Sequence, residues 1–269
     1  MRLTFLGTAA SEGYPAAFCD CANCRAARRL GGRSSRRRAA ALVDDELLID
    51  LGPDLIASAT ALGRSLNSVR HCLVTHQHRD HLDPGNLEWR SFASNTGVET
   101  LDLYGSPGAL GTLGQPDPTA WKLRLHPVAP FEWRSVGPYR VAAVLARHSS
   151  RLTVLLYLVQ HEGRTLFYAT DTTLLPDETV GWLRGESVRV DLLAMDHTFG
   201  LCDQDEGHLN GARFVEQVDR LRAAGILTDG SRVFATHIAH DCNPPHDELV
   251  AQARARGYQV AYDGLVVDV

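Results

Sequence analysis

The sequence predicts an α/β (α+β) protein in which helices flank a sandwich of two mixed β-sheets. Short apolar segments alternate with amphipathic ones, and the order strands, helix, strands, helix occurs twice along the chain. No internal repeat or low-complexity linker interrupts this order, so we expect residues 1–269 to form a single domain. At 44% hydrophobic residues the chain can bury a substantial core, which excludes a disordered protein.

The first half of the chain is expected to hold several strands and one helix. Aliphatic and β-branched residues bounded by turn residues are typical of strands, and a proline suits the first turn of a helix. The expected strands are Leu3–Leu6, Ala39–Val43, Glu46–Ile49 and His71–Thr75, and the expected helix is Pro53–Leu62.

The second half of the chain is also expected to alternate strands and helices. Its expected strands are Val141–Ala146, Thr153–Val159, Thr165–Ala169, Val190–Met195 and Arg232–Thr236, and its expected helices are Asn210–Ala224 and His246–Arg256. Near the end, Gln259–Tyr262 and Leu265–Val267 are predicted to form a hairpin, because the Asp263-Gly264 pair between them favours a tight turn.

Four potential metal ligands occur within six residues, directly after the expected strand 71–75. They are His76, His78, Asp80 and His81. Divalent metals of intermediate hardness accept imidazole nitrogen and carboxylate oxygen, and a rigid strand end can direct such groups to one point. The spacing therefore predicts a metal site rather than a polar loop with unrelated histidines.

Four ligands from one loop are too few for two ions, and three further candidates follow other expected strands. His148, Asp171 and His237 each come directly or shortly after a strand end. Any one of them alone would be an ordinary surface residue. Their shared position predicts that all seven residues line one binuclear centre.

A second cluster lies in the loop at residues 19–24, where Cys19, Cys21 and Cys24 follow one another closely. In a cytosolic chain such a cluster is typical of a metal site before a disulfide framework. Three thiolates can hold a tetrahedral zinc that needs a fourth ligand. We expect His240 to supply it, with Cys242 as the competing ligand, and three reduced thiols on a loop as the alternative to any zinc site.

The H-x-H-x-D-H motif resembles the signature of the metallo-β-lactamase superfamily, whose fold is an αββα sandwich. By that resemblance His76, His78 and His148 would hold one ion. Asp80, His81 and His237 would hold the other, and Asp171 would bridge the two.

The N-terminal stretch narrows this resemblance to the PhnP-like branch of the superfamily. Gly7-Thr8-Ala9-Ala10, Gly13-x-Pro15 and the cysteine cluster carry it, and a histidine just after the last metal-binding histidine would complete the structural zinc. The branch implies a cyclic phosphodiesterase acting on a substrate such as 5-phosphoribosyl 1,2-cyclic phosphate. A hydroxide shared by two divalent ions, Zn²⁺ or Mn²⁺, would attack phosphorus.

The same branch implies a general acid outside the metal ligands. A histidine in the region of His208 would protonate the leaving oxygen, so the catalytic residues expected are His208 and Asp80. A histidine that only caps a helix or lies on the surface is the alternative role for His208, and His197 is a weaker rival for the same function.

The overall composition bears on partners. The formal net charge of −5 argues against nucleic acid, although seven arginines and no acid lie between residues 25 and 38. These arginines form either a solvated basic face or a surface that attracts an anionic substrate. No apolar run is long enough for a membrane span and the N-terminus lacks signal-peptide features, so we expect a cytoplasmic protein, compatible with a homodimer.

Two other functions share these residues. The same metal centre can hydrolyse another ester or a lactone, because a nucleophile that attacks phosphorus can also attack a carbonyl. The cysteine cluster also resembles PqqB proteins of cofactor biosynthesis, which suggests a non-catalytic accessory or carrier protein. The complete ligand set favours the enzyme.

Overall fold

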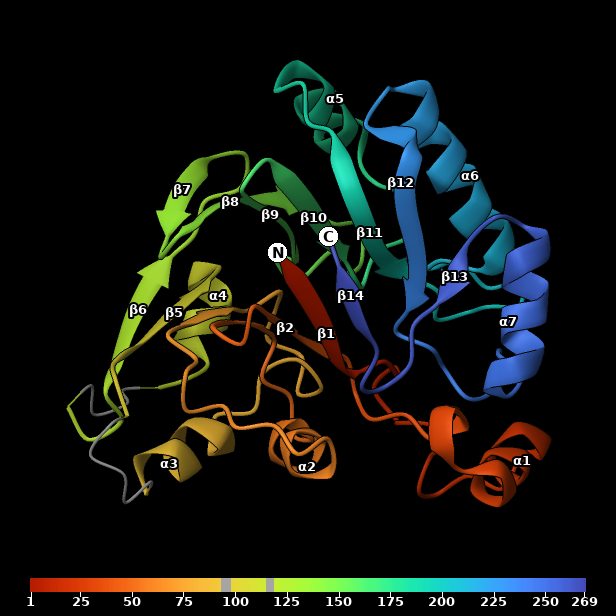
Figure 1. Ribbon diagram of the computed structural model, residues 1–269, viewed down its shortest axis with the longest axis horizontal. Coiled ribbons are helices and arrows are strands. Elements are labelled where there is room, and N and C mark those ends of the chain that lie inside the picture. The colour runs from red at the N-terminus through yellow and green to blue at the C-terminus, as the bar shows by residue number, and fades with distance from the viewer. Residues whose placement is uncertain (93–97, 115–118) are drawn as a thin grey trace.

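Two β-sheets face each other in the computed structural model, which describes residues 1–92, 98–114 and 119–269 (Figure 1). The first sheet has seven strands within these residues, in the order β14-β1-β2-β3-β4-β5-β6. The strands are β1 (Arg2–Gly7), β2 (Ala40–Val43), β3 (Leu47–Ile49), β4 (His71–Leu73), β5 (Leu101–Gly105), β6 (Leu123–Pro127) and β14 (Val266–Asp268). Antiparallel pairs join β14, β1, β2 and β3, and parallel pairs join β3 to β6, so the sheet is mixed.

The second sheet also has seven strands in the described part of the chain, in the order β13-β12-β11-β10-β9-β8-β7. They are β7 (Trp133–Val136), β8 (Tyr139–Leu145), β9 (Leu155–His161), β10 (Arg164–Ala169), β11 (Val190–Asp196), β12 (Leu227–Thr236) and β13 (Gln259–Val260). The pairs from β10 to β13 are parallel and those from β7 to β10 are antiparallel.

Helices cover the outer face of each sheet, which gives the four layers of an αββα sandwich (Figure 1). The helices are α1 (Ala22–Leu30), α2 (Leu55–Ala61), α3 (Gly85–Ser91), α4 (Pro107–Gly111), α5 (Asp177–Gly185), α6 (Gly211–Ala223) and α7 (His246–Ala255), with a short 3₁₀ turn at Gly32–Ser34. The predicted fold class is confirmed.

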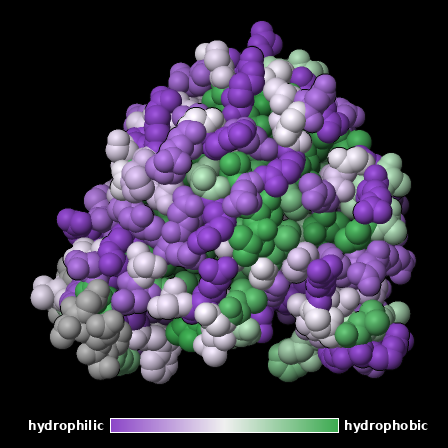
Figure 2. All heavy atoms as spheres, viewed as in Figure 1, coloured by the Kyte–Doolittle hydropathy of each residue, from purple (hydrophilic) through white to green (hydrophobic). Residues whose placement is uncertain are grey.

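Alternating strand residues fill three apolar layers. The central layer lies between the sheets and includes Phe5 and Phe234, whose ring centroids are 6.0 Å apart. Leu193 and Phe214 belong to the layer between the second sheet and its helices, and Leu103 belongs to the layer outside the first sheet. Figure 2 shows mostly hydrophilic side chains on one face, with apolar ones near its centre. No helix in the described residues is long and apolar enough to cross a membrane.

The predicted C-terminal hairpin is wrong. β13 pairs in parallel with β12 of the second sheet, whereas β14 pairs antiparallel with β1 of the first. The Asp263-Gly264 turn therefore carries the chain from one sheet to the other. Two hydrogen bonds hold this turn against the N-terminal segment: Asp263 accepts the Thr8 hydroxyl at 2.7 Å and the Arg37 backbone N–H at 2.6 Å.

The arginine-rich segment is not a uniform basic face. Arg36 is buried and donates to the Thr8 hydroxyl at 2.8 Å, and its other terminal nitrogen lies 2.9 Å from His246 Nδ1. Arg38 pairs with Asp54 at 3.0 Å. Part of the positive charge in this segment is thus used to tie the N-terminal loop to the rest of the protein.

Truncation of the layer between the sheets should destabilise the protein. Phe5 is fully buried, so Phe5→Ala should lower the free energy of unfolding by about 3–5 kcal/mol, because it leaves a cavity that the sheets cannot fill. Val266, on the neighbouring strand, is 42% exposed, so Val266→Ala should change it by less than about 0.5 kcal/mol. Denaturant titration of both variants measures the difference, and equal midpoints would contradict the assigned core.

Candidate metal centres

Strand direction brings the expected ligands of the second sheet to one edge. β10, β11 and β12 are mutually parallel, and β8 runs in the same direction because both it and β10 are antiparallel to β9. His148, Asp171 and His237 follow the carboxyl ends of β8, β10 and β12, respectively. Parallel strands end at a common edge, so these three side chains meet although 89 positions separate the first from the last in sequence.

The first sheet contributes the H-x-H-x-D-H loop at the facing edge. This loop follows β4, which is parallel to β3. The Thr75 carbonyl accepts the backbone N–H of Leu155 at 2.9 Å, and this bond joins the two sheets beside the loop. The motif thus lies directly opposite the ligands of the second sheet.

Three histidines form the first group of candidate ligands. His78 Nδ1 lies 2.9 Å from His76 Nε2 and 3.3 Å from His148 Nε2. One nitrogen from each ring lies within 4.8 Å of the others, close enough for all three to bind a single ion.

Asp80, His81 and His237 form the second group. Asp80 Oδ2 is 3.1 Å from His81 Nε2 and 3.7 Å from His237 Nε2. Asp171 lies between the groups: its Oδ2 is 3.1 Å from His81 Nε2, and its Oδ1 is 3.9 Å from His148 Nε2. The structure therefore brings all seven expected residues together, and its groups include the two sets that the resemblance implies.

The arrangement fits divalent cations because it leaves buried polar atoms without hydrogen bonds. His81 Nε2, His237 Nε2 and Asp171 Oδ2 are buried and have no hydrogen-bond partner in the described residues. Such atoms are costly unless something else satisfies them. Asp171 and His237 also have positive φ angles of 58° and 57°, a strained backbone that the surrounding structure imposes on these ligands.

Two of the candidate ligands, Asp171 and His76, are held in the charge states that metal binding requires. Burial opposes ionisation of Asp171, but the neighbouring His237 and His81 outweigh it and hold the pKa of Asp171 well below its usual range. Burial lowers the pKa of His76 well below its usual value, and the other histidines add to that effect. A carboxylate and a neutral imidazole are the forms that bind metals.

Two buried aspartates outside the predicted set orient the ligands. Asp50 Oδ2 lies 2.7 Å from His81 Nδ1, and Asp50 Oδ1 accepts the Thr75 backbone N–H at 2.8 Å. Asp196 accepts the Asp171 backbone N–H at 3.0 Å. Asp50 directly follows β3 and Asp196 is the last residue of β11, so the strand-end signal that identified Asp171 could have found them. Such outer carboxylates fix ligand orientation and raise ligand basicity.

His208 lies at this edge, beside the metal-ligand residues. Its Nδ1 is 2.7 Å from Asp196 Oδ2 and 3.1 Å from the Thr198 hydroxyl. Burial opposes the charged ring, but the Asp196 carboxylate outweighs it and raises the pKa of His208 to about 9. The preceding Gly207, at φ 78°, accepts a hydrogen bond from His148 Nδ1 at 2.9 Å, so the loop with His208 packs against a candidate ligand.

His197, the weaker rival for the acid, points into the protein core. Its Nδ1 is 3.0 Å from Asn243 Oδ1 and its Nε2 is 2.9 Å from the Tyr258 hydroxyl. Burial lowers the pKa of His197 to about 4, so the ring is neutral near pH 7. Both nitrogens are occupied by structural partners, which leaves none for a substrate.

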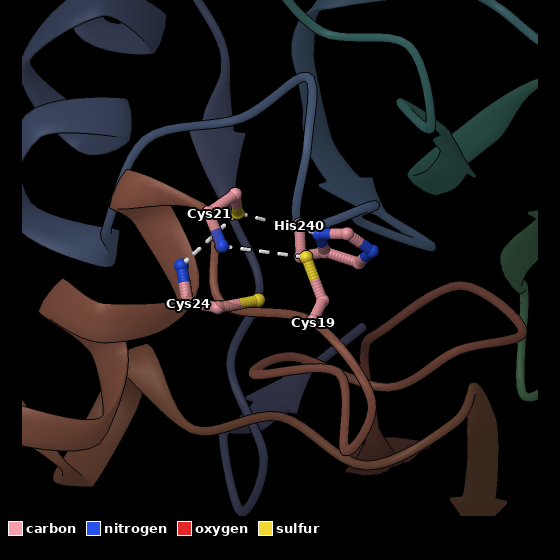
Figure 3. Close-up of side chains that lie close together, drawn as sticks. All are labelled: Cys19, Cys21, Cys24 and His240. Atoms are coloured by element: carbon pink, nitrogen blue, oxygen red, sulfur yellow. Dashed lines mark hydrogen bonds between the residues drawn. The ribbon is translucent and has the colours of Figure 1, made fainter.

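The second centre joins the start of α1 to the segment after β12. Figure 3 shows the side chains of Cys19, Cys21, Cys24 and His240 grouped together. Their ligand atoms all lie within 4.8 Å of one another, and Cys21 Sγ is 3.6 Å from His240 Nδ1. Asn23 Nδ2 donates to the His240 carbonyl at 2.9 Å, which holds the two segments in place. Three thiols and one imidazole form a donor set suited to tetrahedral zinc.

Backbone N–H groups surround the sulfur atoms of this cluster. Cys21 Sγ accepts the Cys24 N–H at 3.4 Å and Cys19 Sγ accepts the Cys21 N–H at 3.4 Å. Burial disfavours the thiolate, but these bonds and His240 outweigh it and lower the pKa of Cys21 to about 7. Burial raises the pKa of Cys24 to about 12, so its binding to a metal releases a proton.

Cys242, the competing fourth ligand, has a different partner. It forms a disulfide with Cys202, which connects the loop after β11 to the segment before α7. The Leu201 backbone N–H also donates to the Cys242 carbonyl at 2.8 Å. His240 is therefore the residue that faces the three clustered cysteines. The sequence contained no spacing signal for the 202–242 pair.

Comparison with known proteins agrees with this geometry. The family model described as "Beta-lactamase superfamily domain" matches residues 45–238. The chain belongs to the β-lactamase superfamily. No match was found among the curated proteins.

Solved structures support the same relationship. A structure described as a new diphosphatase from the PhnP family has a TM-score of 0.78 and 27% identity, covering 99% of this chain and 97% of that one. Zn²⁺-bound PqqB from Methylobacterium extorquens has a TM-score of 0.70 at 19% identity, covering 100% of both chains. Human tRNase Z, short form, has a TM-score of 0.69 at 18% identity, covering 100% of this chain and 99% of that one. The predicted metallo-β-lactamase fold and its PhnP-like relationship are confirmed, and the fold is that of a metal-binding hydrolase.

Disruption of the cysteine centre should cost stability. Cys21→Ser should remove one tightly held zinc per chain and lower the melting temperature by about 5–10 °C, because a structural zinc contributes folding free energy. Elemental analysis and thermal unfolding measure both effects. Cys72→Ala, which removes a buried thiol outside the cluster, should keep the zinc. An unchanged zinc content in Cys21→Ser would refute the assignment.

Proposed function

We propose that this protein is a binuclear metal-dependent phosphodiesterase that hydrolyses a small, cyclic phosphodiester such as a phosphoribosyl cyclic phosphate. One observation carries the proposal: a complete seven-residue ligand set lies beside His208, whose Nδ1 is 2.7 Å from Asp196 Oδ2. His76, His78 and His148 would hold one ion, Asp80, His81 and His237 the other, and Asp171 would bridge them. Zn²⁺ and Mn²⁺ both suit these donors.

Two divalent ions held by these residues would supply a nucleophile from water at neutral pH and would polarise the phosphoryl oxygens. The protein supplies the proton. Asp196 holds His208 by Nδ1, so Nε2 is the ring nitrogen left for the substrate. The pKa near 9 keeps His208 protonated at neutral pH, and its side chain is 16% exposed. His208 Nε2 then donates its proton to the departing oxygen, and Asp196 stabilises the charged ring beforehand.

The similarity to a PhnP-family diphosphatase supports a reaction at phosphorus. A diphosphatase cleaves a bond between phosphorus and oxygen, and the proposed reaction cleaves the same type of bond. The ligands alone do not discriminate this reaction from hydrolysis of another ester or a lactone. His208 favours a hydrolase over an accessory protein, since an alkoxide leaving group, whether from a phosphodiester or from an ester, requires a proton. A PqqB-like accessory protein would need no such acid.

Turnover on three probes tests the proposal. Metal-loaded protein should hydrolyse bis-p-nitrophenyl phosphate and a ribose cyclic phosphate, should be slower on a simple lactone, and should lose activity with chelator. Preference for the lactone would replace the proposal by an ester or lactone hydrolase. Inactivity with zinc and with manganese on all three probes would favour the accessory protein.

Asp171→Asn should abolish turnover, because it removes the negative charge placed between the two groups of ligands. We expect a loss of about 10²-fold or more, accompanied by lower metal content, since even outer-sphere changes cost 10–100-fold. Asp102→Asn is the matched control: Asp102 also binds a histidine, His126 at 2.7 Å, but lies on β5 away from the site. Full metal content and activity in Asp171→Asn would contradict the bridging role.

Replacement of His208 should depend on the leaving group. His208→Ala should reduce turnover of a ribosyl phosphodiester by about 10²–10⁴-fold and cost far less on a p-nitrophenyl ester, because p-nitrophenolate leaves without a proton. His161→Ala, on the remote strand β9, serves as the control. Equal losses on both substrates would mean that His208 positions the substrate, and a loss of metal would make it a ligand.

A further inference from the structure

The hydroxyl of Thr198 lies between a candidate metal ligand and the candidate acid. Its Oγ1 is 2.8 Å from His237 Nδ1 and 3.1 Å from His208 Nδ1. The rings of these two histidines are stacked, with their centroids 5.4 Å apart. Thr198 is 5% exposed and comes two residues after the end of β11. A single buried oxygen therefore contacts both histidines.

The carboxylate of Asp196 has no acceptor position left for His237. Its Oδ1 accepts two backbone N–H groups, at 2.9 and 3.2 Å. Its Oδ2 accepts the Asp171 backbone N–H at 3.0 Å and lies 2.7 Å from His208 Nδ1. A carboxylate has about four acceptor positions, and these four contacts fill them. His237 Nδ1, which is 4.0 Å from Asp196 Oδ2, must therefore bind a different group.

The hydrogen bonds around Thr198 determine which nitrogen of His237 is available to a metal. The hydroxyl has one hydrogen, and it donates this hydrogen to the His237 carbonyl at 3.0 Å. Toward His237 Nδ1 the same oxygen acts as an acceptor, so Nδ1 carries a hydrogen. Nε2 is buried, has no hydrogen-bond partner in the described residues and lies 3.7 Å from Asp80 Oδ2. Nε2 is therefore the nitrogen that is free to bind an ion.

The first sheet holds its corresponding ligand in a different way. His81 Nδ1 lies 2.7 Å from Asp50 Oδ2, and the Thr75 hydroxyl donates to the Asp50 carboxylate at 3.0 Å. There the carboxylate contacts the ligand, and the threonine supports the carboxylate. In the second sheet the carboxylate of Asp196 contacts His208, and the threonine contacts the ligand directly. The two partners have thus exchanged their roles.

We propose that Thr198 is a positioning residue, which holds the ring of His237 by Nδ1 and directs its Nε2 toward the second ion. Asp196 thereby stays bound to the acid, His208. The inference rests on the binuclear centre of the proposed function and adds the residue that allows Asp196 to serve the acid. Loss of the group that binds the outer nitrogen of a metal-bound histidine typically lowers metal affinity by about 10–100-fold.

Two substitutions at this position test the role of the hydroxyl. Thr198→Val keeps the shape of the side chain but removes the acceptor, so the affinity for one of the two ions should fall by about 10–100-fold. Thr198→Ser keeps the hydroxyl, so both affinities should stay within about threefold of those of the intact protein. Competition with a metal chelator, in the absence of substrate, measures these affinities.

Thr179→Val is the matched control. Thr179 is also buried, and its hydroxyl also donates to a backbone carbonyl, that of Leu145 at 2.8 Å, but it lies on α5. Thr179→Val and Thr198→Val should lower the melting temperature of the metal-free protein to a similar extent, because each removes one buried hydroxyl. The rise in melting temperature on adding metal should be reduced only in Thr198→Val.

Turnover of bis-p-nitrophenyl phosphate separates weak metal binding from other damage. Its leaving group departs without a proton, so this substrate reports on the ions rather than on His208. Thr198→Val should be slow at limiting metal, and excess metal should restore its rate to within about threefold of the intact rate, because the defect lies in affinity.

Four results would overturn the positioning role: unchanged metal affinity in Thr198→Val, an equal loss in Thr198→Ser, an equal loss in Thr179→Val, or no recovery of Thr198→Val with excess metal. The affinities are measured without substrate, so they decide the role of Thr198 independently of the reaction. Inactivity of the intact, metal-loaded protein on every probe overturns the proposed function alone. An intact protein that binds fewer than two ions at the centre overturns both.

Discussion

The structure depends on gathering seven candidate metal ligands at the edge where two β-sheets meet. His81, Asp171 and His237 are almost fully buried, yet polar atoms of all three have no hydrogen-bond partner in the described residues. Unsatisfied buried groups of this kind are strongly destabilising in an apolar protein interior. Bound cations would satisfy them, so metal binding and the stability of this edge are linked.

The strands and two buried aspartates around this edge fix the positions of the candidate ligands. Parallel strands place Asp171 and His237 at one edge of the second sheet. Asp196 accepts the backbone N–H of Asp171, and Asp50 lies 2.7 Å from the ring of His81 in the opposite loop. Asp196 contacts both the backbone of Asp171 and the ring of His208. One carboxylate therefore couples the position of a candidate bridging ligand to the protonation of the candidate acid.

The two centres are also connected through the chain. His237 and His240 lie three residues apart, one at the binuclear group and the other at the cysteine cluster. The 202–242 disulfide anchors this segment to the loop that leads to His208. A structural zinc at His240 would therefore limit the motion of the candidate ligand His237 as well as stabilise the N-terminal loop.

Sequence reasoning succeeded where a short spacing carried the chemistry. The ligands from His76 to His81 and the cysteines from Cys19 to Cys24 are close in sequence, so their grouping needs no tertiary information. The αββα class followed from the alternation of strands and helices.

Sequence reasoning failed where contacts between residues far apart in the chain determine the structure. The Asp263-Gly264 turn has a hairpin signal, but the partners of β13 and β14 lie in different sheets. The burial of Arg36 depends on His246, 210 residues away, and the bond between Cys202 and Cys242 also joins distant segments. The outer aspartates Asp50 and Asp196 had the same strand-end signal as Asp171 but lack a motif that would single them out.

Anomalous diffraction from crystals of the metal-loaded protein tests the central claim most directly. The account predicts two peaks at the binuclear centre, one among His76, His78 and His148 and one among Asp80, His81 and His237, with Asp171 in contact with both. A third peak should lie among the three cysteines and His240, and it should be seen only at the X-ray absorption edge of zinc. A single peak at the centre, or two peaks with Asp171 bound to neither, would contradict the account.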